Sequence, residues 1–485
     1  MQQQVYHSRD LQAWEQRWFQ QQNSSYGLMQ QVAWGISQRL ITLFSQQKIK
    51  KIAVCCGQGN NACDGYLVAK YLKQAGFSVD IYAVELGNSK DLASAVQEAQ
   101  QAGLQPYSHF DFQSECEVYI DALFGIGLNR QLDFDWQNVI QTINQQTGLK
   151  ISIDIPSGLD ANTGQPLPVA IKADYTFTGL GLKAGLFTGQ GKEYAGKIEL
   201  ISAIPTDTEL QPIACLSSHQ IQLPKREAFG HKGSYGHVLV VGGHADMGGA
   251  VIMAAEAAFA AGAGKVTIVC DAKHHTAILS RAPNIMLRDI NLLTQEQRQA
   301  LIQQVDAVCF GMGLGRDSWS EQQYTAWFEL TQQSDLEVVL DADALWFLAK
   351  QPQVLNSQTY ATPHPGEAAT LLACSTAEVE MDRIAAIHAL QQKYQGQWVL
   401  KGSGSLILEE RLYICNAGNA GMGTGGMGDV LAGMIASLKA QFAQKIYLHE
   451  IVTLHALAGD ELAKNGERGL QAQDMKHAIY QVVNR

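Results

Sequence analysis

Short apolar runs alternate with segments of helical periodicity over the first part of the chain. Six runs have strand character, at residues 51–56, 77–84, 116–125, 150–158, 173–179 and 196–202. Segments with apolar residues at helical spacing separate most of them, as at 66–76. This alternation predicts a parallel sheet with helices on both faces.

The pattern lapses at residues 203–225, where three prolines and no clear period indicate a domain boundary. Five more predicted strands follow, at 236–243, 265–270, 306–315, 337–345 and 397–408, with helices at 247–264 and after Asp429. We therefore predict an α/β protein of two domains, residues 1–215 and 225–485. The two series share a class but show no aligned repeat, so simple duplication is not supported.

The N-terminal segment has a different character from the sheet-forming regions. Residues 1–26 are polar and rich in glutamine, which predicts a short helical arm, and the break NSSYG follows it. Residues 27–45 carry apolar positions at helical spacing, so a further helix is expected there.

Composition and charge narrow the class of protein. The chain has 485 residues, 46% of them hydrophobic, and a formal net charge of −11, which favours a folded protein and argues against a generic nucleic-acid or anionic-membrane surface. No apolar run reaches about 18 residues, and no signal-peptide pattern is visible, so we expect no membrane segment. Nine scattered cysteines without paired metal spacing fit reduced thiols in the cytoplasm.

A glycine-rich loop near the C-terminus is the strongest chemical signal. Six glycines fall between Gly418 and Gly428, directly before Asp429 and an apolar helical segment. Glycines let backbone N–H groups crowd a ligand, and a helix N-terminus favours an anion such as phosphate. An acid beside phosphate suggests a base that deprotonates an attacking hydroxyl. The alternative, an N-capping aspartate behind a flexible loop, stays open on this loop alone.

Three further loops strengthen the functional interpretation. KGSGS, residues 401–405, follows a predicted strand and adds N–H donors and a cation, and FGMGLGRD, residues 310–317, is another glycine loop. TPHPGE, residues 362–367, fixes His364 between two prolines before a predicted helix. Such loops converge at the carboxyl edge of a doubly wound sheet, where ligands bind.

Together with HKGSYGHVLVVGG (residues 231–243) and GTGGMGDVLAG (423–433), these motifs resemble the ribokinase-like ADP-dependent NAD(P)H-hydrate dehydratases. The resemblance covers residues 225–485. It implies that Asp429 activates the hydroxyl of hydrated NADH or NADPH for phosphorylation by ADP, with phosphate then leaving. It also implies Mg²⁺ accompanying the nucleotide. The implied nucleotide-binding residues are Lys401, Gly402, Ser403, Gly404, Ser405 and Gly428, and those facing the hydrated dinucleotide are Ala250, Gly313, His364 and Asp429.

The first half carries acids at three predicted strand ends. CGQGNNACDGYLVAK (56–70) joins a strand to a helix, DALFGIGLNR (121–130) begins with Asp121, and SIDIPSGLD (152–160) contains Asp154. Each aspartate alone could form a turn. Three at consecutive strand ends favour a binding site.

These segments resemble the NAD(P)H-hydrate epimerase domain, a Rossmann-like three-layer α/β/α fold, over residues 1–215. The resemblance implies K⁺ bound by Asn61, Asp121 and Ser157, and Asp154 as the acid–base residue that interconverts R and S forms. Arg130 would contact phosphate, although a surface arginine is the alternative. The residues implied to contact the hydrated dinucleotide are Asn60, Asn61, Ala62, Cys63, Asp64, Gly125, Ile126, Gly127, Leu128, Asn129, Arg130, Gln131 and Asp154.

The chain departs from that family pattern at two places. The usual GNNGGDG has Ala62 and Cys63 in place of its two glycines, which would strain the backbone if either position required positive φ. Gln30 also stands where the family often has an acid.

The leading interpretation is a bifunctional repair enzyme that acts on hydrated NADH and NADPH, in which the epimerase supplies the epimer that the dehydratase accepts. Its partners are expected to be these small molecules and ADP, with no nucleic acid or membrane, in a homo-oligomer. Two alternatives remain: a ribokinase-like small-molecule kinase, which would release a stable phosphorylated product, and a non-catalytic dinucleotide sensor, which would not need Asp429.

Overall fold

The computed structural model describes residues 3–84, 87, 89–112 and 115–485 of the chain. These residues form two compact units, Gln3–Cys215 and Leu216–Arg485. The division falls inside the segment 203–225, where the alternating pattern of the sequence lapses.

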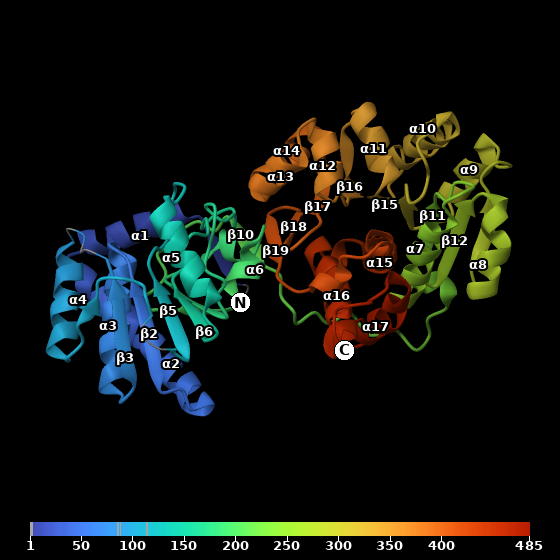
Figure 1. Ribbon diagram of the computed structural model, residues 1–485. Coiled ribbons are helices and arrows are strands. Elements are labelled where there is room, and N and C mark those ends of the chain that lie inside the picture. The colour runs from blue at the N-terminus through green and yellow to red at the C-terminus, as the bar shows by residue number, and fades with distance from the viewer. Residues whose placement is uncertain (1–2, 85–86, 88, 113–114) are drawn as a thin grey trace. The chain divides into compact units, whose positions relative to one another are not determined.

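The first unit is built on a seven-stranded parallel sheet (Figure 1). Its order is β4-β3-β2-β5-β6-β7-β9, so the chain runs outward from β2 in both directions. The strands are β2 (Lys51–Cys56), β3 (Ser78–Ala83), β4 (Pro106–Tyr107), β5 (Val118–Ala122), β6 (Leu149–Ile153), β7 (Tyr175–Gly179) and β9 (Lys197–Ile201).

Helices cover both faces of this sheet, as the alternating pattern predicts. One face packs against α2 (Ser25–Gln47), α3 (Asn60–Gln74) and α4 (Lys90–Gln101). The other packs against α5 (Phe134–Gln145). Because both faces are covered, β2 is apolar at nearly every position instead of alternating.

The N-terminal arm is a helix, α1 (Ser8–Gln20), separated from α2 by a short turn. Its apolar residues Leu11 and Trp14 are buried in a small satellite cluster with Tyr6 and Leu210. Three short strands lie nearby, β1 (Gln4–Tyr6), β8 (Leu182–Lys183) and β10 (Ala214–Leu216), where β1 pairs with both others. The short helix α6 (Gly191–Ala195) precedes β9.

The second unit contains a larger sheet in the order β13-β12-β11-β14-β15-β16-β17-β18-β19. Pairing is parallel from β13 to β17 and antiparallel from β17 to β19. The strands are β11 (His237–Val241), β12 (Lys265–Cys270), β13 (Met286–Asp289), β14 (Ala307–Phe310), β15 (Glu337–Leu340), β16 (Leu355–Ala361), β17 (Gln395–Leu400), β18 (Ser405–Leu408) and β19 (Leu412–Cys415).

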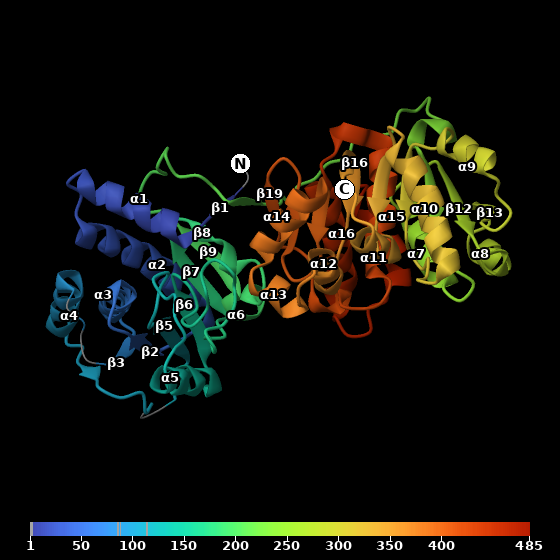
Figure 2. The same ribbon diagram turned by 90° about the horizontal axis from the view of Figure 1, so that it is seen from above.

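Two groups of helices flank this sheet (Figures 1 and 2). One group is α7 (Gly248–Ala260), α15 (Met427–Phe442), α16 (Leu448–Leu462) and α17 (Met475–Val482), and the other is α10 (Ser318–Gln332), α11 (Asp343–Lys350), α12 (Pro365–Leu372) and α14 (Arg383–Tyr394). Helices α8 (His275–Arg281), α9 (Gln295–Ile302) and α13 (Thr376–Met381) complete the unit. Helix α15 packs closely on α7, since a Cβ on Gly433 would lie 2.0 Å from the carbonyl oxygen of Ala254.

Several predicted strands are longer than the observed ones. The prediction at 337–345 is wrong beyond Leu340, because Asp343 begins α11. The single strand predicted at 397–408 is a hairpin, β17 and β18, whose turn holds the KGSGS motif. The helix predicted at 66–76 begins earlier, at Asn60. Within the described part of the chain, no helix is long and apolar enough to cross a membrane.

Candidate functional sites

A cavity of about 430 Å³ opens at the carboxyl edge of the first unit's sheet. Its wall is formed by the loops after β2, β5 and β6, by Phe177 and Lys183, and by side chains of α1 and α2. The structure therefore brings the three acid-bearing strand ends of the sequence to one place.

Asp121 organises the floor beside this cavity. Ser152 Oγ and the backbone N–H of Ser157 donate to Asp121 Oδ2, each at 2.8 Å, and Ser157 Oγ donates to Asp121 Oδ1 at 2.5 Å. Burial raises the pKa of Asp121, and the hydrogen bonds from Ser157 and Ser152 oppose that shift. The aspartate thus locks the SIDIPSGLD loop to β5.

Asn61 joins the same cluster from the first turn of α3. Its Nδ2 donates to the carbonyl oxygen of Phe124 at 2.9 Å, and Ser157 Oγ lies 3.2 Å from that oxygen. Asn61 Oδ1 is buried and has no hydrogen-bond partner in the described protein. The cluster is rich in oxygen, and one of these buried oxygens lacks a donor.

Lys183 is a residue of this site that no sequence motif indicates. Its side chain is 1% exposed, and its Nζ donates to Asp154 Oδ1 at 2.6 Å, Thr178 Oγ1 at 2.7 Å and the Gly179 carbonyl oxygen at 2.9 Å. Asp154 Oδ2 accepts the backbone N–H of Ile126 at 3.1 Å. A lysine in the short strand β8 has no recognisable motif, although charged side chains are seldom buried without a partner.

The structure divides the predicted epimerase residues into two groups. The cavity is lined by Asn60, Asn61, Asp64, Gly125, Ile126, Gly127, Leu128, Arg130 and Asp154. Asn129 and Gln131 are exposed outside the lining, whereas Ala62 and Cys63 are buried in the core against the sheet. Ala62 and Cys63 both lie in α3, and neither has positive φ. The two substitutions for glycine therefore do not strain the backbone.

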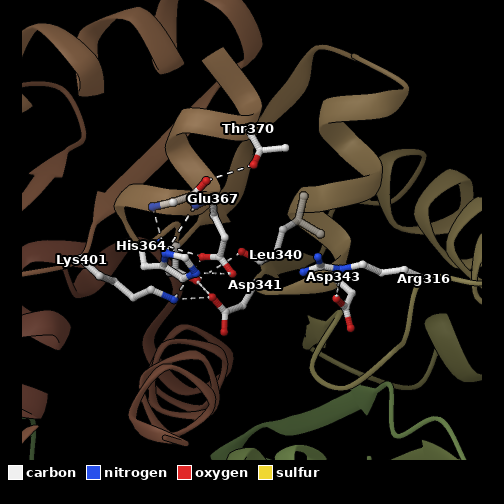
Figure 3. A network of polar contacts seen from close by, with 10 residues as sticks. Arg316, Leu340, Asp341, Asp343, His364, Glu367, Thr370 and Lys401 are labelled. Carbon is white, nitrogen blue, oxygen red and sulfur yellow. Dashed lines mark hydrogen bonds and ion pairs between the residues drawn. The ribbon is translucent and has the colours of Figure 1, made fainter. Parts of the chain in front are cut away.

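In the second unit, a polar network centres on Lys401 at the end of β17 (Figure 3). Lys401 Nζ donates to Asp341 Oδ1 at 2.7 Å and lies 3.7 Å from Glu367 Oε2. Thr362 Oγ1 also donates to Asp341 Oδ1, at 2.9 Å. Burial lowers the pKa of Lys401, but the carboxylates of Asp341 and Glu367 outweigh it and leave that pKa above its usual value.

Asp429 lies in the first turn of α15, next to this network. The helix is capped by Gly426, which has φ of 92° and makes no side-chain cap, so Asp429 is not the N-cap. A Cβ on Gly428 would lie 3.1 Å from Lys401 Nζ, so a larger residue there would require the ammonium group to shift by a few tenths of an ångström. Burial, together with the charge of Asp341, raises the pKa of Asp429 to about 7, while Lys401 lowers it.

His364 has a structural part in this site. It is the N-cap of α12, and its Nδ1 accepts the backbone N–H groups of Gly366 at 3.0 Å and Glu367 at 3.4 Å. Glu367 Oε2 in turn accepts the backbone N–H of His364 at 2.8 Å. The imidazole is 56% exposed with Nε2 3.5 Å from Glu367 Oε1, so it is also accessible to a ligand.

The other predicted residues of this half lie in two places, around Gly313 and in the β17–β18 hairpin. Gly313 has φ of 57°, and a Cβ there would lie 3.4 Å from that of Ala250, so these two residues are neighbours. Gly402, Ser403 and Gly404 lie in the β17–β18 turn, where Gly402 contacts the Arg383 guanidinium, and Ser405 begins β18. Among the KGSGS residues, Lys401 is the one that belongs to the polar network with Asp341.

A second cavity, of about 590 Å³, borders the glycine-rich loop. It lies between residues 420–425 and 467–473, with Met253 of α7 beside them. The loop thus has open space on one side and the Asp429 turn immediately after it.

Sequence reasoning also missed Asp341, Glu367 and Asp343 as members of this network. Asp343 Oδ1 accepts Arg316 Nε at 2.7 Å, and its Oδ2 accepts the backbone N–H of Gly315 at 2.8 Å. The acids of DADAL, residues 341–345, fall inside a predicted strand, and a strand pattern gives no indication of a site. Among the described residues, no group of three or more His, Cys, Asp or Glu side chains could hold a metal ion.

Two family models match the chain, one in each unit. Residues 25–185 match the YjeF-related protein N-terminus, and residues 238–481 match the NAD(P)H-hydrate dehydratase family. The fold and the two matched regions define an enzyme of two activities.

Relatives that match most of the chain identify the class of enzyme more closely. The chain is 36% identical to a bifunctional NAD(P)H-hydrate repair enzyme of Coxiella burnetii over 99% of both chains. It is 39% identical to that of Vibrio cholerae, over 87% of this chain and 86% of the relative. A ribokinase-like superfamily protein of Enterococcus faecalis is 28% identical with a TM-score of 0.49, covering 54% of this chain and 92% of that chain.

The chain therefore belongs to the bifunctional NAD(P)H-hydrate repair enzymes. It is an enzyme with epimerase and dehydratase activities toward hydrated NADH and NADPH, rather than a small-molecule kinase or a non-catalytic sensor.

Proposed function

We propose that the first unit interconverts the R and S forms of hydrated NADH and NADPH, and that the second dehydrates the S form at the expense of ADP. The products would be NADH or NADPH, AMP and phosphate. The observation that carries this proposal is Asp429, which follows the glycine-rich loop and adjoins the Lys401–Asp341 ion pair.

Asp429 has the properties of a general base. Burial brings its pKa to about 7, so that it can accept a proton and still be ionised in much of the protein near neutrality. It would take the proton of the substrate hydroxyl as that oxygen attacks the β-phosphorus of ADP and the bond to AMP breaks. Phosphate then leaves the ring, a proton is lost from the adjacent carbon, and the double bond is restored.

Backbone groups and Lys401 would stabilise the phosphates during this transfer. Glycines 423–428 expose N–H groups at the start of α15, where the helix dipole favours an anion. Lys401 has two carboxylate neighbours and stays 19% exposed, so it can also reach a phosphate. Gly428 and the turn 402–405 would complete the nucleotide contacts, and Ala250, Gly313 and His364 would face the hydrated dinucleotide.

The two expected metal ions fit the structure differently. Asn61 Oδ1, which has no hydrogen-bond partner among the described residues, forms with Asp121, Ser157 and the Phe124 carbonyl oxygen an oxygen set suited to K⁺. The ion would supply a positive charge that fixes the substrate loops. No comparable ligand group for Mg²⁺ exists among the described residues, so Mg²⁺ would have to enter with the nucleotide.

The decisive experiment gives the protein a mixture of R and S hydrated NADH together with ADP. We expect dihydronicotinamide absorbance to recover from both epimers, with AMP and phosphate released in equal amounts. Recovery from the S form alone would remove the epimerase role of the first unit. A stable phosphorylated dinucleotide without recovery of absorbance would remove the dehydratase role of the second.

The assembly and location remain proposals of the same kind. We propose a cytoplasmic homo-oligomer whose partners are the hydrated dinucleotides and ADP. The nine cysteines, none of them in a disulfide, support a reducing compartment such as the cytoplasm, and the net charge of −11 argues against a nucleic-acid partner. Light scattering of the purified protein tests the oligomer directly.

A further inference from the structure

Helix α1 contributes an acid to the first cavity that neither the motifs nor the proposed roles include. Glu15 lines the cavity wall together with Leu11 and Gln12 of the same helix. Its carboxyl accepts no hydrogen bond from the described residues of the protein. The sequence predicts a polar helical arm here, but the inner face of α1 is part of the site.

Charged groups from four other elements face Glu15 or share its cavity. Asp64 comes from α3, Asp154 follows β6, Lys183 belongs to β8, and Arg130 lies in the loop after β5. Burial, the charge of Asp154 and the opposing charge of Lys183 together bring the pKa of Glu15 to about 7. Burial and the charges of Asp154 and Glu15 likewise raise the pKa of Asp64.

Lys183 cannot act directly on a substrate, because its three N–H donors are all engaged. They are held by Asp154, Thr178 and Gly179 at 2.6–2.9 Å, and the side chain is 1% exposed. Asp154 is held at both oxygens, by Lys183 and by the backbone N–H of Ile126. It also has φ of 69°, which is uncommon outside glycine and here fixes the direction of the carboxylate. Lys183 is therefore a positioning residue for Asp154.

We propose that Glu15 and Asp154 form the acid–base pair of the epimerase and serve opposite faces of the hydroxyl-bearing ring carbon, with Lys183 holding Asp154 in place. This inference rests on the proposed epimerase role of the first unit. Moving a hydroxyl between two faces needs a proton donor where water leaves and an acceptor where water arrives. The two carboxylates reach the cavity from different walls, α1 and the sheet edge.

In one direction, Glu15 donates its proton to the leaving hydroxyl, the carbon–oxygen bond breaks, and water departs. The ring nitrogen's lone pair stabilises the cation that remains. Water then bonds to the opposite face of the same carbon and gives its proton to Asp154. The net result is one proton moved from Glu15 to Asp154, which is the protonation state that the reverse reaction needs. A carboxylate anchored by Lys183 is base enough, because water bonding to a cationic carbon becomes strongly acidic.

The test follows interconversion of purified S and R hydrated NADH by chromatography, without nucleotide so that dehydration does not run. Glu15→Gln should lower the epimerisation rate by about 10²–10⁴-fold while binding of hydrated NADH, measured by calorimetry, changes by less than about 3-fold. Glu15→Asp should recover part of the rate. Asp10→Asn, which removes an acid of α1 outside the cavity lining, is the matched control and should leave the rate unchanged.

The pH profile separates catalysis from structure. In the wild type, kcat/KM should fall as pH rises through about 7 and Glu15 loses its proton, and Glu15→Gln should lack that limb. Lys183→Met should lower kcat much more than it changes KM, because Asp154 loses the ammonium group that holds its carboxylate in place, and Lys183→Arg should recover part of kcat. Glu15→Gln at the wild-type rate, or an unchanged alkaline limb, would overturn the inference. If Glu15→Gln failed to fold, Glu15→Asp and the wild-type limb would decide in the same way. A wild type that binds hydrated NADH but never interconverts it would instead remove the proposed function.

Discussion

The two sites reach a similar electrostatic arrangement with different elements. Each has a lysine–aspartate ion pair, Lys183–Asp154 at 2.6 Å and Lys401–Asp341 at 2.7 Å. Each also has a further carboxyl whose pKa is raised to about 7, chiefly by burial. In the first unit that carboxyl is Glu15 of a covering helix, whereas in the second it is Asp429 in the first turn after the glycine loop.

The difference between the lysines shows what each site is built to do. Lys183 is 1% exposed with all of its donors satisfied, while Lys401 is 19% exposed beside a glycine turn. A lysine with spare donors can bind a phosphate, and a saturated one can only orient its neighbour. This difference fits the proposed roles, in which the second site binds an anionic cosubstrate and the first transfers protons without one.

The largest expected effect comes from Asp429→Asn. Loss of a general base should lower dehydration of S hydrated NADH by about 10²–10⁴-fold. The wild-type and variant rates are compared from the absorbance regained in the presence of ADP. Binding of ADP, followed by calorimetry, should survive, and the R–S interconversion of the first unit should continue at the wild-type rate. Loss of both activities together would contradict independent sites.

The pH dependence of dehydration should have the opposite sign to that of epimerisation. Asp429 must be ionised to act as a base, so kcat/KM should rise as pH increases through about 7. Lys401 lowers the pKa of Asp429 and Asp341 raises it. Lys401→Met should thus move the rising limb to higher pH, and Asp341→Asn should move it to lower pH.

These two variants are controls for each other, since both disrupt the same ion pair. If both variants moved the rising limb in the same direction, loss of the Lys401–Asp341 ion pair would set the pH profile, and the separate charges of these two residues beside Asp429 would not. A limb that stays in place in both variants would remove Asp429 as the titrating group.

Part of each site could be predicted from the sequence, for a physical reason. Parallel strands bury both faces, so their apolar runs and the edge loops between them are visible in the sequence, and they bring Asp121, Asp154 and Asn61 together. The glycine-rich loop and Asp429 are consecutive in the sequence, so this part of the second site is visible as a motif. Glu15 and Lys183 lie 168 positions apart, and neither has a motif, so only tertiary packing brings them to Asp154.

The same limit explains the strands that were misjudged. The predicted strands run past Leu340 and Phe310 because alanine and leucine after Leu340, and glycine, methionine and leucine after Phe310, continue the run of small and apolar residues. Helix α3 was begun too late because its first turn, from Asn60, is polar where it faces the cavity. The first turn of a helix that faces a binding site is polar, so it lacks the apolar residues from which a helix is recognised in a sequence.

A smaller effect is expected from His364→Ala, which separates capping from ligand contact. Removing the N-cap acceptor of α12 should lower the free energy of unfolding by about 1 kcal/mol, measured by chemical denaturation. If the imidazole also faces the hydrated dinucleotide, the KM for that substrate should rise several-fold with kcat retained. His364→Asn restores a capping side chain, so it should recover the stability but not the KM. An unchanged KM in both variants would leave His364 with the cap alone.

The smallest effect concerns the departure from the family glycines at the start of α3. Ala62 is fully buried against the sheet with helical backbone, so the methyl group fills space and the position does not need glycine. Ala62→Gly should lower the free energy of unfolding by about 0.5–1 kcal/mol, through greater freedom of the unfolded chain, and leave R–S interconversion unchanged. An epimerase made faster by Ala62→Gly would mean that the alanine constrains the neighbouring Asn61, whose buried amide oxygen is the proposed K⁺ ligand. Such a gain should then be larger at low K⁺ concentration, which distinguishes a better ion site from a merely looser helix.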